Sequence, residues 1–529
     1  MTLQDYLKLR NGSDVRGVAC TGIVGEPVNL TTEAVEKIAK AFCVWLISRT
    51  GKTQVTVAIG YDSRITSPAL CKAAVQGIIS SGHNAVITGL STTPSMFALL
   101  QDERLMQENY CHGSIMITAS HLPFNRNGMK FFSHIGGLEA LDVKEILELA
   151  ATYRFPEGRE GNQTELSYLD IYANTLVEKV RQSTSQEKPL LGKRIIVDAG
   201  NGAGGFFADK VLAPLGADTT GSQFLNPDGT FPNHIPNPEN TEAMLSICEA
   251  VKKHNADLGI IFDTDVDRAG AVDQDGVEIN RNRLIALISA ILLREKPGTI
   301  VTDSVTSDGL ANFIKKKGGK HLRFKRGYKN VINEAIRLNE SGEYTPLAIE
   351  TSGHAALLEN YFLDDGAYLI TRLLIALANL NQEGKNLTDL IADLEMPKEA
   401  IELRVKLPAD IDFKRLGDKV IEDFIKKSKK LPYTYSAENN YEGFRLNFDE
   451  YHGNGWALLR MSLHDPVLPI NVESNALDGC IKIVKELYYF LKNYKALDLT
   501  PFEKYIDGWR QTKKNIIQKN LEKQLKNKI

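Results

Sequence analysis

The chain has 529 residues, with 63 Lys and Arg against 66 Asp and Glu, a net charge of -3 and 43% hydrophobic residues. These values are typical of globular proteins and exclude a disordered, collagen-like or coiled-coil chain, and the length implies about three to five domains. The near-neutral balance argues against a nucleic-acid partner, because counterion release needs a clustered excess of Lys and Arg.

The N-terminal residues 1–14 contain Asp5, Lys8 and Arg10 and no apolar core of a secretion signal. The long apolar stretch at 284–293 is far shorter than the roughly 18 residues of a membrane span. The six cysteines show no C-x-x-C spacing, so we expect free thiols. Together these features predict a cytoplasmic protein without a membrane partner.

Apolar, β-branched runs alternate with amphipathic segments along most of the chain. A helix is expected at 32–48, a strand at 55–60, and a strand at 194–200 before another helical segment. This alternation predicts α/β domains with parallel or mixed sheets. Polar turns follow the strands at 55–60, 194–200 and 258–262, and the carboxyl ends of strands are where ligands bind in such folds.

Pro-bearing polar breaks at 183–189, 294–298 and 394–400 divide the chain into segments of domain size. The segment 511–529 carries six Lys and one Glu, with apolar residues at near-helical spacing. It favours a solvated C-terminal helix over a basic patch for RNA or membrane. The predicted domains are 1–185, 186–297, 298–396 and 397–500, followed by a helical extension at 501–529.

The segment 114–132 begins as an apolar strand, turns, and returns through an Asn-Gly pair at 127–128. We interpret this pair as a tight hairpin turn with positive φ. Such a turn presents Ser120 beside His121 and facing Lys130. A serine hydroxyl is a weak nucleophile unless it is activated or used as a phosphoryl carrier, so the pattern alone also allows an ordinary turn serine.

Asp263, Asp265 and Asp267 alternate directly after the apolar strand at 258–262. Three carboxylates this close raise one another's pKa unless a cation lies between them, and hard oxygen ligands select Mg²⁺ or Ca²⁺. An EF-hand is excluded, since Arg268 stands at its sixth position, where Gly is required. The pattern favours a divalent metal site over a solvated acidic turn.

Two further turns carry polar side chains of interest. Arg460 and Ser462 follow the strand at 456–459, and this pair suits a phosphate, although an incidental surface turn has the same residue types. Glu350 and Ser352 lie in a Gly-bearing turn, where alternate residues of an extended chain point the same way and both can reach sugar hydroxyls. Ordinary turns use these residue types too.

Together the motifs are more specific than separately. T-A-S-H-x-P with a following N-G-x-K, then D-x-D-x-D-R, E-x-S-G-H and R-x-S, resemble in order and approximate spacing the α-D-phosphohexomutase family of phosphoglucomutases and phosphomannomutases. The resemblance covers residues 11–475, and segments 12–17, 60–64 and 231–239 add to it. It implies an α/β protein of four domains around a central cleft: three similar mixed-sheet α/β domains and a smaller C-terminal α+β domain.

The resemblance also implies an activity: an intramolecular phosphotransferase that interconverts hexose 1-phosphate and hexose 6-phosphate of glucose, mannose or both. Ser120 would carry the phosphoryl group, and hexose 1,6-bisphosphate would be both intermediate and activator. Mg²⁺ would bind Asp263, Asp265, Asp267 and Ser120. The other catalytic candidates are Lys130, Arg16, His354 and His121, and the sequence does not decide which group is the base. Substrate contacts are expected from Glu350, Ser352, Arg460, Ser462, His464, Lys329 and Arg268.

The chain departs from the family pattern at several positions. Leu463 and His464 replace the usual glycine and threonine of the phosphate-binding loop, so a protonated His464 would make phosphate affinity fall as pH rises. Ile349 replaces a customary glycine, and Thr351 leans toward glucose or mannose over glucosamine phosphates.

Two alternatives to a mutase stay open: a hexose 1,6-bisphosphate synthase and a non-catalytic sugar-phosphate sensor. The joint presence of Ser120, the three aspartates and Lys130 disfavours the sensor. We expect hexose phosphates as the small-molecule partners, in a monomer or homodimer.

Overall fold

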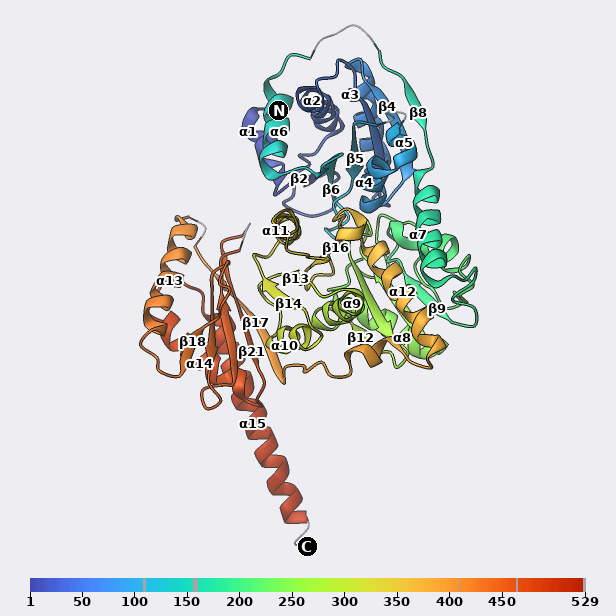
Figure 1. The fold of residues 1–529 in the computed structure, drawn as a ribbon. Coiled ribbons are helices and arrows are strands. Elements are labelled where there is room, and N and C mark those ends of the chain that lie inside the picture. Colours follow the sequence, from blue (N-terminus) through green and yellow to red (C-terminus); the bar gives the residue numbers. More distant parts are fainter. Residues whose placement is uncertain (108–110, 156–159, 409, 463–464, 527–529) are drawn as a thin grey trace. The chain divides into compact units, whose positions relative to one another are not determined.

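The structure is a computed structural model that describes residues 1–107, 111–155, 160–408, 410–462 and 465–526 (Figure 1). It separates into two compact units. Unit 1 comprises Met1–Glu295 and Pro346–Ala392, and unit 2 comprises Lys296–Thr345 and Asp393–Ile529.

Unit 1 begins with an eight-stranded mixed sheet of order β1-β2-β6-β5-β3-β4-β8, in which β7 pairs with β6. The pairs of β3 with β4 and β5, and of β4 with β8, are parallel, whereas β5–β6, β2–β6 and β1–β2 are antiparallel. The strands are β1 (Arg10–Asn11), β2 (Asp14–Val18), β3 (Thr56–Tyr61), β4 (Asn84–Leu90), β5 (Gly113–Ile117), β6 (Arg126–Ser133), β7 (Gly136–Gly137) and β8 (Gln163–Glu165).

Helices pack their apolar residues against this sheet. Phe42 and Ile38 of α2 are fully buried in one cluster with Phe131 and Ile117 of the strands. Capping sets the limits of α2, since its N-cap threonine accepts a backbone N–H and the glycine after its last residue has a φ of 67°. The helices of this part are α1 (Leu3–Lys8), α2 (Thr32–Thr50), α3 (Ser67–Ser80), α4 (Thr93–Gln101), α5 (Glu103–Gln107), α6 (Ala140–Thr152) and α7 (Tyr168–Thr184).

A second, four-stranded mixed sheet of order β12-β11-β10-β9 follows in unit 1. β9 and β10 are parallel, whereas β10–β11 and β11–β12 are antiparallel. Ile247 and Val251 of α8 pack with Ile261 of β10 in its core. The elements are β9 (Ile195–Asp198), the short helical turns η1 (Ala203–Gly205) and η2 (Phe207–Leu212), α8 (Thr241–His254), β10 (Leu258–Phe262), β11 (Ala269–Asp273), β12 (Glu278–Ile279) and α9 (Asn282–Glu295).

The last part of unit 1 is the antiparallel pair β15 and β16 with a long buried helix, α12. The turn between the two strands, residues 350–354, holds three of the expected site residues. The elements are β15 (Leu347–Ile349), β16 (Ala355–Leu357), η3 (Leu358–Asn360), α12 (Gly366–Gln382) and η4 (Leu387–Ile391).

Unit 2 contains the parallel pair β13 and β14 and a five-stranded antiparallel sheet of order β17-β21-β20-β19-β18. Its second sheet shares an apolar core with α13, α14 and the start of α15. The elements are β13 (Thr299–Thr302), α10 (Asp308–Lys316), β14 (Lys320–Arg323), α11 (Tyr328–Glu340), β17 (Glu399–Lys406), α13 (Phe413–Ser428), β18 (Thr434–Ser436), β19 (Phe444–Phe448), β20 (Gly455–Leu459), β21 (Val467–Ser474), α14 (Gly479–Leu491) and α15 (Thr500–Lys526).

These elements confirm the expected alternation of strands and helices and the helical C-terminal extension, which Figure 1 shows as the single long helix α15. The exact domain boundaries stay predictions. In the described part of the chain, no helix has both the length and the apolar character that a membrane span needs.

Candidate functional site

The serine loop, residues 118–125, connects β5 to β6 and places Ser120 at the carboxyl end of a fully buried strand. Ser120 is 2% exposed and adopts a φ of 50°, which is unusual for a residue other than glycine. The Ser120 backbone N–H donates to the Thr118 hydroxyl at 2.8 Å. The loop therefore holds a buried serine in a defined, left-handed backbone conformation.

The predicted turn at Asn127-Gly128 is wrong. Both residues lie inside β6, and Gly128 does not have a positive φ. Glycine is needed there for close packing, because a Cβ at Gly128 would lie 2.2 Å from the Val15 carbonyl oxygen and 2.7 Å from that of Thr118. The pair was misread because Asn-Gly signals a hairpin only where the chain reverses, and the chain reverses within the serine loop instead.

The acidic loop, residues 263–268, connects β10 to β11 and buries three carboxylates almost completely: Asp263, Asp265 and Asp267. One oxygen of each lies within 4.8 Å of the others. Asp263 Oδ2 accepts a hydrogen bond from the Ser120 hydroxyl at 2.8 Å. The loop includes Val266 with a φ of 66°, a strained conformation for a β-branched residue. The two loops thus meet at Ser120.

Charge governs the protonation of these carboxylates. Burial, together with the negative charges of Asp267 and Asp265, raises the pKa of Asp263 well above its ordinary value. Burial acts in the same sense on Asp267, but the charges of Lys130, His354 and Arg268 outweigh it and lower the pKa of Asp267. A divalent cation among the three carboxylates would lower the pKa of Asp263 and favour its ionised form.

Two cations lie at the acidic loop, Lys130 from β6 and Arg268 from the loop itself. Lys130 of β6 forms an ion pair with Asp267, and its Nζ lies 3.1 Å from Asp265 Oδ2. Arg268 Nη2 donates to the Ser120 hydroxyl at 3.1 Å. The structure thus places Arg268 in direct contact with the Ser120 side chain and Lys130 against two of the three carboxylates.

Arg16 of β2 lies close to the same cluster. Its Nη2 donates to Asp14 Oδ2 at 2.8 Å. Burial lowers the pKa of Arg16, but the negative charges of Asp14, Asp265 and Asp267 outweigh burial, so the pKa is raised. A charged guanidinium is a poor proton acceptor, so Arg16 is suited to binding an anion rather than to taking a proton.

His121 is held beside the serine as a neutral ring. Its Nδ1 accepts a hydrogen bond from Arg268 Nη2 at 2.9 Å and lies 3.3 Å from Ser120 Oγ. Burial, the Arg268 charge and the Arg16 charge lower the pKa of His121 to about 2. Its other nitrogen, Nε2, therefore carries the proton and can donate to a ligand.

His354 enters the site from the turn between β15 and β16. Its Nδ1 lies 2.6 Å from Asp364 Oδ2 and 3.8 Å from Asp267 Oδ1. Burial lowers its pKa, but the Asp364 charge outweighs burial, so the pKa is raised. Asp364 was missed because the Asp-Asp pair before α12 resembles an ordinary helix cap, a role that Asp365 does fill.

Glu350 and Ser352 share the His354 turn and are both buried. The Ser352 hydroxyl donates to Glu350 Oε2 at 3.4 Å, and the Glu350 backbone N–H donates to the His354 carbonyl. The tight turn thus presents the two expected hydroxyl-binding residues together, adjacent in sequence to the histidine.

The remaining predicted residues belong to unit 2. Arg460 directly follows β20 and is 5% exposed; its Nη1 lies 3.8 Å from Glu442 Oε1. Burial, only partly opposed by the Glu442 charge, lowers the pKa of Arg460. Ser462 is half-buried, and Lys329 lies in the first turn of α11. His464 and Leu463 lie outside the described residues.

Sequence reasoning missed Glu442, which accepts hydrogen bonds from the Ser304 hydroxyl at 2.5 Å and the Arg326 backbone N–H at 3.0 Å. It lies in a loop without regular structure between β18 and β19, so no periodicity marks it.

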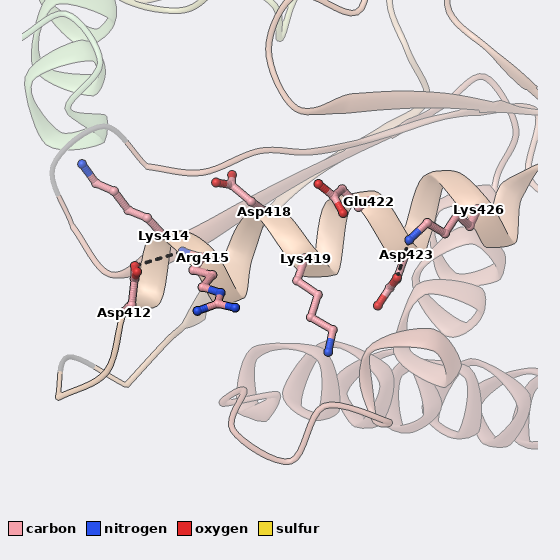
Figure 2. A pocket seen from close by; sticks show the side chains of 8 residues that line it. All are labelled: Asp412, Lys414, Arg415, Asp418, Lys419, Glu422, Asp423 and Lys426. Carbon is pink, nitrogen blue, oxygen red and sulfur yellow. Dashed lines mark hydrogen bonds and ion pairs between the residues drawn. The ribbon is translucent and has the colours of Figure 1, made fainter.

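A surface hollow of about 770 Å³ lies along α13, and Figure 2 shows most of its lining side chains projecting from that helix, with Asp412 just before it. Its charges are partly neutralised locally, since Lys426 Nζ donates to Asp423 at 3.3 Å. The lining residues are Asp412, Lys414, Arg415, Asp418, Lys419, Glu422, Asp423 and Lys426. They include none of the expected site residues and have the mixed charge of an ordinary solvated helix face.

Three family models match successive parts of the chain. They are described as phosphoglucomutase/phosphomannomutase α/β/α domain I over residues 8–157, domain II over 170–276 and domain III over 280–396.

Individual proteins are similar over most of their length. A phosphoglucomutase of Neisseria meningitidis is 30% identical over 458 residues, which are 86% of this chain and 91% of the relative. A phosphomannomutase/phosphoglucomutase of Pseudomonas syringae is 29% identical over 427 residues, 80% of this chain and 84% of the relative. A crystal structure of a phosphoglucomutase/phosphomannomutase family protein from Burkholderia thailandensis superposes with a TM-score of 0.75 at 25% identity, covering 94% of this chain and 98% of that one.

Proposed function

Since the chain belongs to the phosphoglucomutase/phosphomannomutase family of hexose phosphate mutases, with its four-domain architecture, we propose that Ser120 carries the phosphoryl group that this isomerase moves between the 1 and 6 positions of a hexose. The observation that carries this assignment is the direct contact of the Ser120 hydroxyl with both Asp263 and Arg268. A buried serine hydroxyl that hydrogen-bonds to one acidic and one basic side chain suits a phosphoryl carrier. The basic group can bind the phosphoryl oxygens, and the acidic group can bind a cation that neutralises them.

The acidic loop fits a divalent cation. Within the described residues, Asp265 Oδ1 and Asp267 Oδ1 are buried oxygens with no hydrogen-bond donor. An all-carboxylate donor set suits Mg²⁺. We propose that Asp263, Asp265, Asp267 and the phosphorylated Ser120 hold Mg²⁺, which would supply charge neutralisation at the phosphoryl oxygens.

Each half-reaction exchanges one P–O bond for another. The bond from phosphorus to Ser120 Oγ breaks as the bond to the sugar oxygen forms, the sugar hydroxyl gives its proton to a base, and Ser120 Oγ ends protonated. The resulting hexose 1,6-bisphosphate then returns its other phosphoryl group to Ser120 by the reverse exchange. Arg268 and His121, which contact each other and the Ser120 hydroxyl, would donate to the phosphoryl oxygens.

His354 is our choice for the base among the candidates. The negative charge of Asp364 beside its Nδ1 raises the pKa of His354 and so makes the neutral imidazole a stronger proton acceptor. Lys130 already donates a hydrogen bond to Asp267 and lies beside Asp265. The pKa of the Arg16 guanidinium is raised, so this group stays protonated. Those two residues suit phosphate binding and charge balance better than proton transfer.

The substrate's distal end needs its own contacts. We propose that Arg460 and Ser462 bind the non-reacting phosphate and that Glu350 and Ser352 bind ring hydroxyls. A buried arginine with an acidic neighbour at 3.8 Å can exchange that neighbour for a phosphate. Substrate contacts of Lys329 and His464 stay predictions, as do the cytoplasmic location and the monomeric or dimeric state.

The mutase and the bisphosphate synthase differ in what they release, and we favour the mutase because the relatives named above carry that name. We propose glucose and mannose phosphates as substrates and bisphosphate as the activator. A synthase needs a separate phosphoryl donor, whereas a mutase is primed by trace bisphosphate.

Intact-mass measurement after incubation with glucose 1,6-bisphosphate tests the assignment. We expect one phosphoryl group on the wild-type chain, none on Ser120→Ala, and conversion of glucose 1-phosphate to glucose 6-phosphate that drops at least about 10⁴-fold in that variant. Ser114→Ala, at a buried serine of β5, is the control and should keep its phosphoryl group. A wild-type chain that bisphosphate cannot phosphorylate would exclude this mechanism.

A further inference from the structure

Arg64 is a fully buried arginine that the proposed mechanism does not use. It lies in the turn after β3 and is 1% exposed. Its guanidinium donates to four backbone carbonyl groups of the serine loop and the start of β6. These acceptors are Leu122 at 2.6 Å, Pro123 and Arg126 at 2.9 Å each, and Ser120 itself.

This pattern is specific for arginine. The planar guanidinium presents five N–H groups in a fixed fork, whereas a lysine ammonium has three donors on one atom. Arg64 also lies over the ring of Phe231, 5.2 Å from its centroid, so its guanidinium packs on an aromatic side chain from the segment between η2 and α8. Because the acceptors are main-chain oxygens, Arg64 holds the path of the loop rather than any one side chain.

Asp62 completes the arrangement from the same turn. Its Oδ1 accepts the Arg64 backbone N–H at 3.0 Å, and its Oδ2 accepts the Thr118 hydroxyl at 2.6 Å. The Thr118 hydroxyl oxygen in turn accepts the Ser120 backbone N–H at 2.8 Å. The Ser120 peptide is thus held on both sides: its N–H through Thr118 and Asp62, and its carbonyl by Arg64.

Such support matters because Ser120 has a φ of 50°. Left-handed backbone is unfavourable for a serine and persists where surrounding bonds impose it. A phosphoryl carrier must also meet its acceptor with sub-ångström precision, and displacement by about 1 Å costs on the order of 10²-fold in rate.

We infer that Arg64 and Asp62 are positioning residues that hold the serine loop in the conformation required for phosphoryl transfer at Ser120. The inference rests on the proposed role of Ser120. It assigns a function to the segment at 60–64, which resembles a family motif in sequence but carries no group that reaches the substrate in the proposed mechanism.

Arg64→Lys is the first test. We expect kcat to fall about 10²-fold with KM changed by less than about twofold, since the substrate-binding residues are untouched. Arg372→Lys is the matched control, because Arg372 is also buried in unit 1 but pairs with Glu295 and Glu359. It should show a comparable loss of thermal stability and a near-normal kcat. Equal kcat values for the two variants would overturn the inference.

Hydrogen exchange supplies a readout that does not need activity. Peptides covering residues 118–126 should exchange at least about tenfold faster in Arg64→Lys than in the wild type and in Arg372→Lys. Unchanged exchange would overturn the inference. A wild-type chain without mutase activity would instead refute the proposed function, so the two failures are distinguishable.

Thr118 provides a milder pair of variants if Arg64→Lys does not fold. Thr118→Val keeps the side-chain shape but removes the hydroxyl between Asp62 and the Ser120 amide, whereas Thr118→Ser keeps it. We expect kcat to fall at least about tenfold in the valine variant and to stay within about twofold in the serine variant. Equal kcat values in both would overturn the inference.

Discussion

The charged residues around Ser120 in unit 1 and Arg460 in unit 2 differ in how closely each charge is paired with an opposite one. In unit 1, Asp263, Asp267, Lys130 and Arg268 are buried together and contact one another directly. In unit 2, Arg460 has one acidic neighbour at 3.8 Å, and within the described residues its Nε has no hydrogen-bond partner. A preorganised cluster suits bond making and breaking, whereas a loosely paired arginine suits a phosphate that must be bound and released.

After the loss of Ser120 itself, the largest effect should come from the acidic loop. Asp265→Asn removes the negative charge of one proposed Mg²⁺ ligand, a side chain that also contacts Lys130 and Thr93. We expect kcat to fall at least about 10³-fold, and Mg²⁺ binding measured by calorimetry to be lost. Asp275→Asn, at an exposed position after β11, is the control and should retain both. Normal Mg²⁺ binding in Asp265→Asn would contradict the proposed ligand set.

The His354–Asp364 pair should give the next largest effect. His354→Asn and Asp364→Asn are each expected to lower kcat about 10²-fold, since one removes the proton acceptor and the other its orienting partner. The double variant should lose little more than either single one, because the two act as one unit. Fully additive losses in kcat would show that the residues act independently.

Arg460 should instead affect binding. Arg460→Lys keeps a charge but loses the two-pronged contact, so KM for hexose phosphate is expected to rise about 10- to 100-fold with a smaller change in kcat. Arg404→Lys, at an exposed arginine of β17, should change neither. A pure loss of kcat in Arg460→Lys would place this arginine with the reacting groups and remove the contrast between the two sites.

The smallest effect is a pH dependence of stability in unit 2. Burial, partly opposed by the Arg445 charge, raises the pKa of Glu473 to about 7. The Glu473 carboxyl therefore binds its proton more tightly in the folded state than in the unfolded state. The stability that this protonated carboxyl contributes is lost as pH rises from about 4.5 through 7. The change is on the order of 3 kcal/mol.

Thermal unfolding between pH 5 and 8 measures this effect. We expect the Tm of the wild type to fall across this range by a few degrees more than that of Glu473→Gln, whose amide does not titrate. Parallel Tm profiles for the two proteins would show that Glu473 is not responsible.

The candidate reacting groups stand in short local patterns of the sequence. The three aspartates stand at alternate positions after an apolar strand, and their mutual repulsion marks them as cation ligands from sequence alone. Ser120 and Lys130 were found through short motifs. The Asn-Gly pair was misassigned, because the same dipeptide serves a turn in one context and close strand packing in another.

By itself, then, the sequence determined the fold class and the family and indicated the candidate reacting groups, because periodicity and short motifs are local properties of the chain. Only the tertiary structure decided which distant groups act together: Asp364 with His354, Glu442 with Arg460, and Arg64 with the carbonyls around Ser120. Those partners are ordinary charged residues in sequence. Burial and proximity, which long-range packing creates, give each of them a specific role.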